Sequence, residues 1–111
     1  MINILVIKEK QTIKTIEATG HSGYAEQGSD IVCSAISTLM ETLANGLIEV
    51  VKADVKVNID ETIPHLSISL NETDFEKCKL SQVLMQSTLL GIKGVAQGFS
   101  KFIKIKEKQN D

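Results

Sequence analysis

Residues 20–33 read GHSGYAEQGSDIVC, and the chain changes its pattern across them. Apolar residues before this stretch alternate along the chain, as they do in β-strands. From Ile31 to Val51 they recur at helical spacing, on a stripe wide enough to predict burial on more than one side. The three glycines and the polar residues of the stretch indicate a loop, and Ser29 or Asp30 supplies the cap of the helix. The fold is therefore expected to combine strands and helices.

The segments on either side of this loop complete the pattern. Strands are expected at 2–7 and 12–19, joined by a turn at 8–11, and at 54–60 and 66–70, joined around Pro64. A second helix begins at the capping-box sequence Thr73-Asp74-Phe75-Glu76 and ends near Gly98, and a last strand follows at 99–106. The order β-β-α-β-β-α-β predicts an α+β fold, a layered domain in which two helices cover a mixed, mostly antiparallel sheet.

Length and composition are typical of one soluble domain, here residues 1–111. Hydrophobic residues make up 42% of the chain but aromatic ones only 4%, so the core is expected to be mostly Ile, Leu and Val. A net charge of -2 argues against nucleic-acid binding as the main role. No apolar run approaches the roughly 20 residues that span a bilayer, and two cysteines do not make a disulfide framework. We therefore expect a cytoplasmic protein with no membrane contact.

Cys33 and His21 are the candidate catalytic pair. The expected helix places Cys33 in its first turn, where unpaired N–H groups and the helix dipole favour the thiolate over the thiol. The loop could bring His21 back to this sulfur, and an imidazole exchanges protons near neutrality. A thiolate nucleophile with such a base is the equipment of a peptide hydrolase. Backbone amides around Cys33 are expected to stabilise the oxyanion. A core cysteine and a surface histidine are the plainer alternative.

The supporting residues have open roles. Asp30 could orient His21 or cap the helix, and a carboxylate beside Cys33 would oppose the thiolate. Ser37 lies one helical turn beyond Cys33 on the same face, where its hydroxyl bonds near the site or to its own helix. Tyr24 either lines a substrate groove or anchors the loop. The positions assigned to a substrate loop are Gly20, Ser22, Gly23, Tyr24 and Gly28.

Other polar residues carry weaker signals. Cys78 is expected to pack or lie partly exposed, and His65 to be solvated in its turn. Neither has neighbours at metal-ligand spacing, and no phosphate-binding glycine loop is present, so no metal or cofactor is expected. A basic stripe near the C-terminus could touch RNA phosphates, but a protected sheet edge is the simpler interpretation: Lys101, Lys104, Lys106 and Lys108. Small residues on the second helix suit either internal packing or a homodimer contact: Ser87, Gly91 and Gly94.

These motifs resemble the Prp family of ribosomal-processing cysteine proteases. The resemblance rests on GHSGY at residues 20–24 and GSDIVCSAIS at residues 28–37, and on length and element order across the chain. It implies that Cys33 is the nucleophile and His21 its base, and that Asp30 and Ser37 occupy characteristic positions. Ser22 and Ser34 stand where alanine is common in the family.

The resemblance also implies a substrate and an assembly. The expected activity is that of a homodimeric cysteine endopeptidase, which removes a short N-terminal extension from the large-subunit ribosomal protein L-twenty-seven after a pair of aromatic residues. Nucleic-acid contact would then be incidental. The alternatives are a noncatalytic ribosome-assembly or binding module, and another thiol-dependent hydrolase or transferase.

Overall fold

The computed structural model describes residues 1–26, 30–60, 62 and 64–110. The elements follow in the expected order: β1 (Ile2–Glu9), β2 (Thr12–Thr19), α1 (Ile31–Asn45), the π-helical η1 (Gly46–Val51), β3 (Val55–Asp60), β4 (His65–Leu70), α2 (Phe75–Gly98) and β5 (Ile103–Gln109). The one change of type is η1, which forms the last turns of the expected 31–51 helix.

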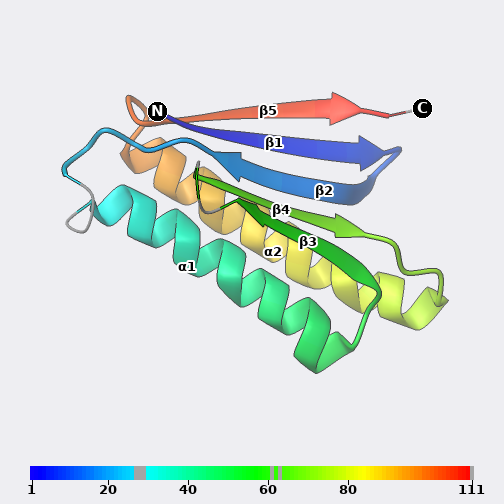
Figure 1. Cartoon of the computed structure of the whole chain (residues 1–111). Helices are drawn as coiled ribbons and strands as arrows, with labels where there is room; N and C mark the ends of the chain where they lie inside the picture. Colours follow the sequence, from blue (N-terminus) through cyan, green and yellow to red (C-terminus); the bar gives the residue numbers. More distant parts are fainter. Residues whose placement is uncertain (27–29, 61, 63, 111) are drawn as a thin grey trace.

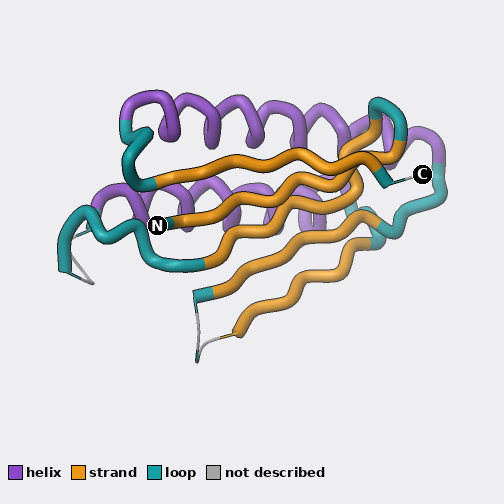
Figure 2. Tube along the Cα trace, turned by 90° about the horizontal axis from the view of Figure 1, so that it is seen from above, coloured by secondary structure: helices purple, strands orange, loops and turns teal. Residues whose placement is uncertain are grey.

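The strands form a single five-stranded sheet in the order β3-β4-β2-β1-β5. Both hairpins pair antiparallel, as expected, and β2 pairs antiparallel with β4. Among the strand pairs of the described residues, β1–β5 alone is parallel. Figures 1 and 2 show α1 and α2 side by side on the same face of this sheet, running in opposite directions. The layered α+β fold with a mixed, mostly antiparallel sheet is therefore confirmed.

The core lies between the sheet and the two helices. Its buried members come from every layer and are aliphatic or methionine, among them Ile4, Val6, Ile16, Val32, Ile36, Met40, Leu43, Ile68, Met85 and Ile92. This agrees with the small number of aromatic residues in the sequence. Because both helices cover one face, the second face of the sheet carries polar side chains and the half-buried Leu5 and Ile7 of β1.

The segment Ile31–Val51 is long and apolar enough, by length and composition, to cross a membrane. The expectation that no run approaches that length is therefore wrong. In the structure this segment packs on the sheet, and Val32, Ile36, Met40 and Leu43 belong to the shared core. Those four residues belong to its buried stripe, whereas Ile31, Ile48 and Val50 of the same segment are exposed.

Two boundaries differ from the expected ones. The cap of α2 is the Asp74 carboxylate, which accepts the Lys77 N–H at 3.0 Å, and not the Thr73–Glu76 pair. Glu72 takes the Thr73 and Asp74 N–H groups instead, both at 3.0 Å. The last strand starts at Ile103, because the Phe99 and Phe102 N–H groups bond to earlier carbonyls and form a turn after α2.

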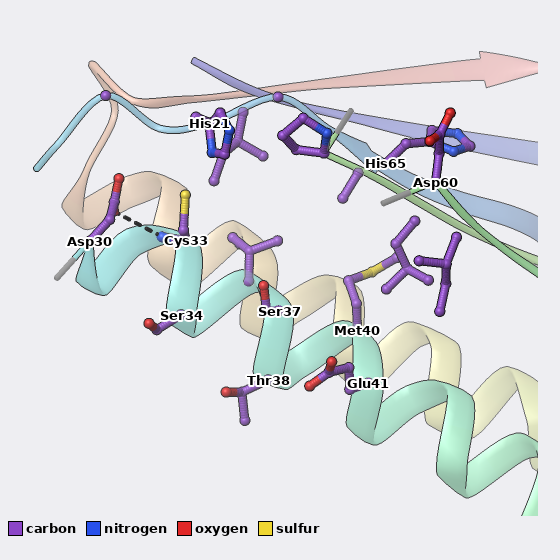
Figure 3. A pocket seen from close by; sticks show the side chains of 18 of the residues that line it. His21, Asp30, Cys33, Ser34, Ser37, Thr38, Met40, Glu41, Asp60 and His65 are labelled. Atoms are coloured by element: carbon purple, nitrogen blue, oxygen red, sulfur yellow. Dashed lines mark hydrogen bonds between the residues drawn. The ribbon is translucent and has the colours of Figure 1, made fainter. Parts of the chain in front are cut away.

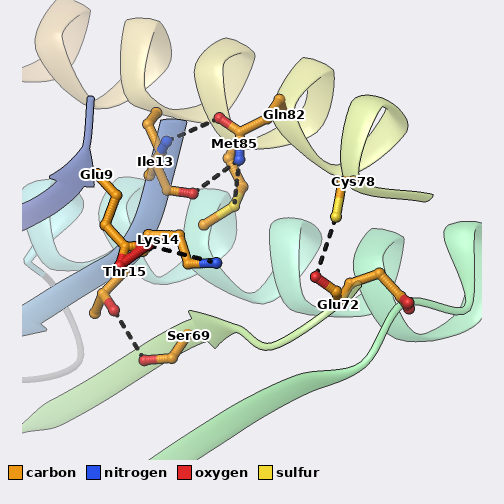
Figure 4. Close-up of polar contacts among 9 residues, drawn as sticks. All are labelled: Glu9, Ile13, Lys14, Thr15, Ser69, Glu72, Cys78, Gln82 and Met85. Carbon is orange, nitrogen blue, oxygen red and sulfur yellow. Dashed lines mark hydrogen bonds and ion pairs between the residues drawn. The ribbon is translucent and has the colours of Figure 1, made fainter. Parts of the chain in front are cut away.

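Polar contacts tie the layers together (Figure 4). The Gln82 side chain of α2 accepts the Ile13 N–H at 2.9 Å and donates to the Ile13 carbonyl at 2.8 Å. Ile13 pairs with Lys8 of β1 beside an irregularity in the β1–β2 register, and it lies outside the stretch of β2 that pairs with β4, so these two bonds link this end of β2 to α2. The Cys78 thiol donates to the Glu72 carbonyl at 3.1 Å, which makes Cys78 a structural contact at the start of α2.

The structure places the C-terminal lysines and the small residues of α2, whose roles the sequence left open. β5 is an edge strand with exposed lysines at 104, 106 and 108, which favours the protected-edge interpretation. A Cβ on Gly91 would lie 3.1 Å from Leu39 of α1, so Gly91 serves internal helix packing. Nothing lies within 4 Å of a Cβ on Gly94, which is exposed together with Ser87.

Candidate active site

The loop after β2 is directed by two glycines with positive φ. Gly20 has φ +90, and a Cβ there would lie 2.5 Å from the Met1 carbonyl oxygen, so a side chain does not fit without a backbone shift. Its N–H donates to the Pro64 carbonyl at 2.9 Å. Gly23 has φ +77, with open space around it. His21 and Ser22 are placed between these two turns.

Asp30 is the cap of α1. It is 5% exposed, and one carboxylate oxygen accepts the Val32 and Cys33 N–H groups, each at 3.0 Å. The other oxygen accepts a hydrogen bond from the buried Ser22 hydroxyl. The capping role therefore accounts for its contacts, and no hydrogen bond joins Asp30 to His21 within the described part of the chain. Ser29, the other candidate cap, lies outside the described residues.

These bonds keep the Asp30 carboxylate ionised. Its burial by itself would raise the pKa, but hydrogen bonds from the Ser22 hydroxyl, from the N–H and thiol of Cys33 and from the Val32 N–H together lower the pKa from 3.8 to about 2. The negative charge of Asp30 lies beside the Cys33 sulfur, which a thiolate mechanism also requires to be negative. Hydrogen bonds from these donors stabilise the carboxylate charge.

Cys33 lies in the first turn of α1, as expected, and is half-buried. Its sulfur accepts the Ser22 N–H at 3.3 Å. The loop therefore adds a backbone donor to the dipole of the helix, and both favour negative charge on this sulfur. Cys33 and Cys78 are free cysteines.

His21 is exposed and lines the same groove as Cys33. Figure 3 shows the Cys33 thiol pointing from α1 toward the loop segment that carries His21. No hydrogen bond joins the two side chains in this structure, which describes both residues. Catalytic hydrogen bonds in unliganded enzymes are often long and tighten when substrate binds.

The groove has a volume of about 940 Å³ and runs between α1 and the end of the β3–β4 hairpin. This is near the upper end of ligand-site volumes. Ser37 and Met40 belong to its α1 wall, and Ile59 and Leu66 to the opposite wall. Figure 3 shows the Ser37 side chain on the groove side of the helix, one turn beyond Cys33. Ile59 is 67% exposed, so the opposite wall offers apolar surface to a ligand.

His65 and Asp60 are groove residues that sequence reasoning missed. His65, expected to be solvated, lines the groove and pairs with Glu17 at 3.1 Å. No short stretch of sequence could have indicated this contact, because His65 and Glu17 are far apart in the chain. The pairing of β2 with β4, in a register that places Thr19 opposite His65, brings them together. The cross-strand partner of His65 on β3 is Asp60, which also lines the groove.

The expected oxyanion donors are already occupied. The Val32 and Cys33 N–H groups bond to the Asp30 carboxylate, and the Ser34 N–H bonds to the Asp30 carbonyl at 3.1 Å. The expectation that amides around Cys33 stabilise the oxyanion is therefore wrong for these three groups.

Tyr24 anchors the loop. Its ring makes edge-to-face contacts with Phe99 and Phe102, at centroid distances of 5.5 and 5.3 Å. This favours the anchoring interpretation over groove lining, and it explains why two phenylalanines stand in the turn before β5. Gly28, the remaining assigned loop position, lies outside the described residues.

Comparison with known proteins places this geometry in a family. The family model described as "Cysteine protease Prp" matches residues 1–104. The chain belongs to the Prp family. The Prp relative from Mycoplasma pneumoniae, named a ribosomal processing cysteine protease, is 30% identical over 112 residues, covering 100% of this chain and 99% of the relative.

Solved structures agree with the Prp fold. The structure of SMU.848 from Streptococcus mutans has a TM-score of 0.86 at 32% identity, covering 99% of this chain and 96% of that one. The structure of the S. aureus ribosomal processing protease Prp with a covalently linked product peptide has a TM-score of 0.88 at 21% identity, covering 97% of this chain and 100% of that one. At that identity the likeness supports the Prp fold alone.

Proposed function

We propose that this protein is a cysteine endopeptidase with Cys33 as nucleophile and His21 as general base. The observation that carries the proposal is the surroundings of Cys33: a first-turn position on α1, a backbone N–H directed at its sulfur, and a groove shared with His21. Membership in the Prp family supports the same chemistry.

The reaction follows from these positions. The Cys33 thiolate attacks the carbonyl carbon of the scissile peptide bond and forms a tetrahedral intermediate. The C–N bond then breaks while the protonated His21 imidazole gives its proton to the leaving amine. Water, deprotonated by His21, attacks the resulting thioester, and Cys33 leaves as the thiolate.

The proposed substrate is the N-terminal extension of the large-subunit ribosomal protein L-twenty-seven, cut after a pair of aromatic residues. The relatives named for ribosomal processing support this substrate class. The apolar groove wall at Ile59 and Leu66 suits aromatic side chains of an extended peptide. We place the protein in the cytoplasm, where ribosomes mature, with only incidental nucleic-acid contact.

We also propose a homodimer formed through α2. The helix carries exposed apolar residues at helical spacing, Leu80, Val83 and Leu90, which are 53%, 61% and 70% exposed. The exposed Ser87 and Gly94 lie among them. An apolar stripe with small residues lets a second helix approach closely, and exposed apolar patches mark contact surfaces.

The test is cleavage of the extended ribosomal protein, with intact masses read by mass spectrometry. Wild type should release the extension, while Cys33→Ala and His21→Ala should lower the rate by roughly a thousandfold or more. Cys78→Ala is the matched control, since that thiol bonds to the Glu72 carbonyl, and it should cut at the wild-type rate. Binding without cleavage by the wild type would favour the noncatalytic ribosome-assembly module instead. Cleavage by Cys33→Ala would exclude the assigned nucleophile.

A further inference from the structure

Ser22 is bonded through both its backbone and its side chain. The residue is 3% exposed. Its hydroxyl donates to the Asp30 carboxylate and accepts the Tyr24 N–H at 3.0 Å, while its own N–H donates to the Cys33 sulfur at 3.3 Å. Asp30 in turn accepts the Cys33 N–H. These contacts form a closed ring from Ser22 to Cys33 to Asp30 and back to Ser22.

We infer that Ser22 is a positioning residue, whose hydroxyl acts through Asp30 to hold the Ser22 N–H against the Cys33 sulfur. The inference rests on the proposed role of Cys33 as nucleophile and adds what orients and activates it. Ser22→Ala removes the hydroxyl and keeps the backbone N–H. The hydroxyl fixes the peptide unit that carries this N–H.

The electrostatic consequence concerns the charge on the sulfur. The Asp30 carboxylate, beside the Cys33 amide, opposes a thiolate there, while the Ser22 N–H favours one. The hydrogen bond from the Ser22 hydroxyl to Asp30 weakens the repulsion between the carboxylate and the thiolate. The same bond fixes the backbone, which keeps the Ser22 N–H directed at the sulfur. Loss of the hydroxyl should therefore make the thiolate harder to form.

The same N–H has a place in the later step. The oxygen of the tetrahedral intermediate is two bonds from the Cys33 sulfur, next to the Ser22 N–H. The nearby Val32, Cys33 and Ser34 N–H groups are all engaged with Asp30. When negative charge moves from the sulfur to that oxygen, the Ser22 N–H can donate its hydrogen bond to the oxygen instead.

The test is the pH dependence of Cys33 alkylation by iodoacetamide, in a Cys78→Ala background so that one thiol reacts. Ser22→Ala should raise the midpoint by about one pH unit, which is roughly a tenfold slower reaction below the midpoint, with an unchanged plateau at high pH. Ser22→Thr, which restores a hydroxyl, should return the midpoint toward wild type. Peptide cleavage by Ser22→Ala should lose kcat with KM nearly unchanged.

Two controls separate positioning from stability. Ser81→Ala removes a hydroxyl that is equally buried, lies on α2 and has no hydrogen-bond partner among the described residues, and it should leave the midpoint unchanged. In an Asp30→Asn background the Ser22→Ala shift should shrink, because the hydroxyl has lost the carboxylate.

An unshifted midpoint in Ser22→Ala, or a shift that stays the same in the Asp30→Asn background, would overturn the inference. Lower activity with an unmoved midpoint would mean a merely structural role and would overturn it too. Alkylation does not require turnover, so these results remain readable if Cys33→Ala still cuts substrate and the proposed function fails.

Discussion

Asp30 makes the stability of the protein depend on acid. Its pKa is lowered to about 2 in the folded state, so the bonded carboxylate stabilises the fold fully above the ordinary carboxyl pKa of about 4. That contribution is lost as the pH falls through about 2. Asp30→Asn should therefore lower the free energy of unfolding at neutral pH, and the difference from wild type should shrink on acidification. Urea denaturation at several pH values measures it, and a difference that is constant with pH would contradict this account.

The residues around Cys33 show what sequence reasoning reaches at this scale. A glycine-rich loop before a helix was enough to place Cys33 in a first turn and His21 near it. The sequence did not reveal that Ser22 bonds to both Asp30 and the sulfur, because that contact depends on how the loop folds back. The occupied amides of the first turn were missed for the same reason.

Gly20 and Gly23 should respond differently to alanine, although both have positive φ. An L-residue at either position costs about 1–2 kcal/mol of backbone strain. At Gly20 a Cβ also meets the Met1 carbonyl oxygen at 2.5 Å, whereas at Gly23 it meets nothing within 4 Å. Gly20→Ala should therefore lose more stability and more cleavage activity than Gly23→Ala. Thermal unfolding and kcat/KM of the two variants test the order, and equal losses would argue against this loop geometry.

Gln82 should matter for the junction of α2 with the first hairpin. Gln82→Met keeps the size of the side chain but removes both bonds to the Ile13 backbone, at 2.9 and 2.8 Å. We expect a loss of about 2 kcal/mol in the free energy of unfolding, near 1 kcal/mol for each bond. Gln86→Met, an exposed change one turn along the same helix, is the control and should cost little. If both variants unfold alike, the Gln82 contact does not stabilise the protein.

Strands and helices were predicted correctly where periodicity is strong, and a boundary was misplaced where a tertiary contact decides it. Alternation and helical stripes predicted both hairpins and both helices. The apolar pattern of Phe99 and Phe102 suggested an early start for the last strand, yet their rings pack on Tyr24 and the chain turns there. The change from α1 to η1 had no sequence signal, because η1 spans only six residues, too few for a different helical period to show.

At the scale of the whole molecule, α2 presents an exposed apolar face, which the proposed dimer would cover. Leu90→Glu puts a charge into that face, and burying an unpaired charge is costly, so this variant should be monomeric and still folded. Val50→Glu, at a residue that is 79% exposed on η1, is the control and should leave the assembly unchanged. Sedimentation velocity measures both masses. A Leu90→Glu dimer as stable as wild type would exclude α2 as the interface.

The account rests most on the Cys33 sulfur becoming bonded to substrate. Acid quenching during turnover, followed by mass spectrometry of the digested enzyme, measures this directly. We predict a covalent adduct on Cys33 whose added mass equals the released N-terminal peptide less one water, absent in Cys33→Ala and formed at an unchanged rate in Cys78→Ala. Turnover with no adduct on Cys33, or with the peptide attached to Cys78, would contradict the central claim.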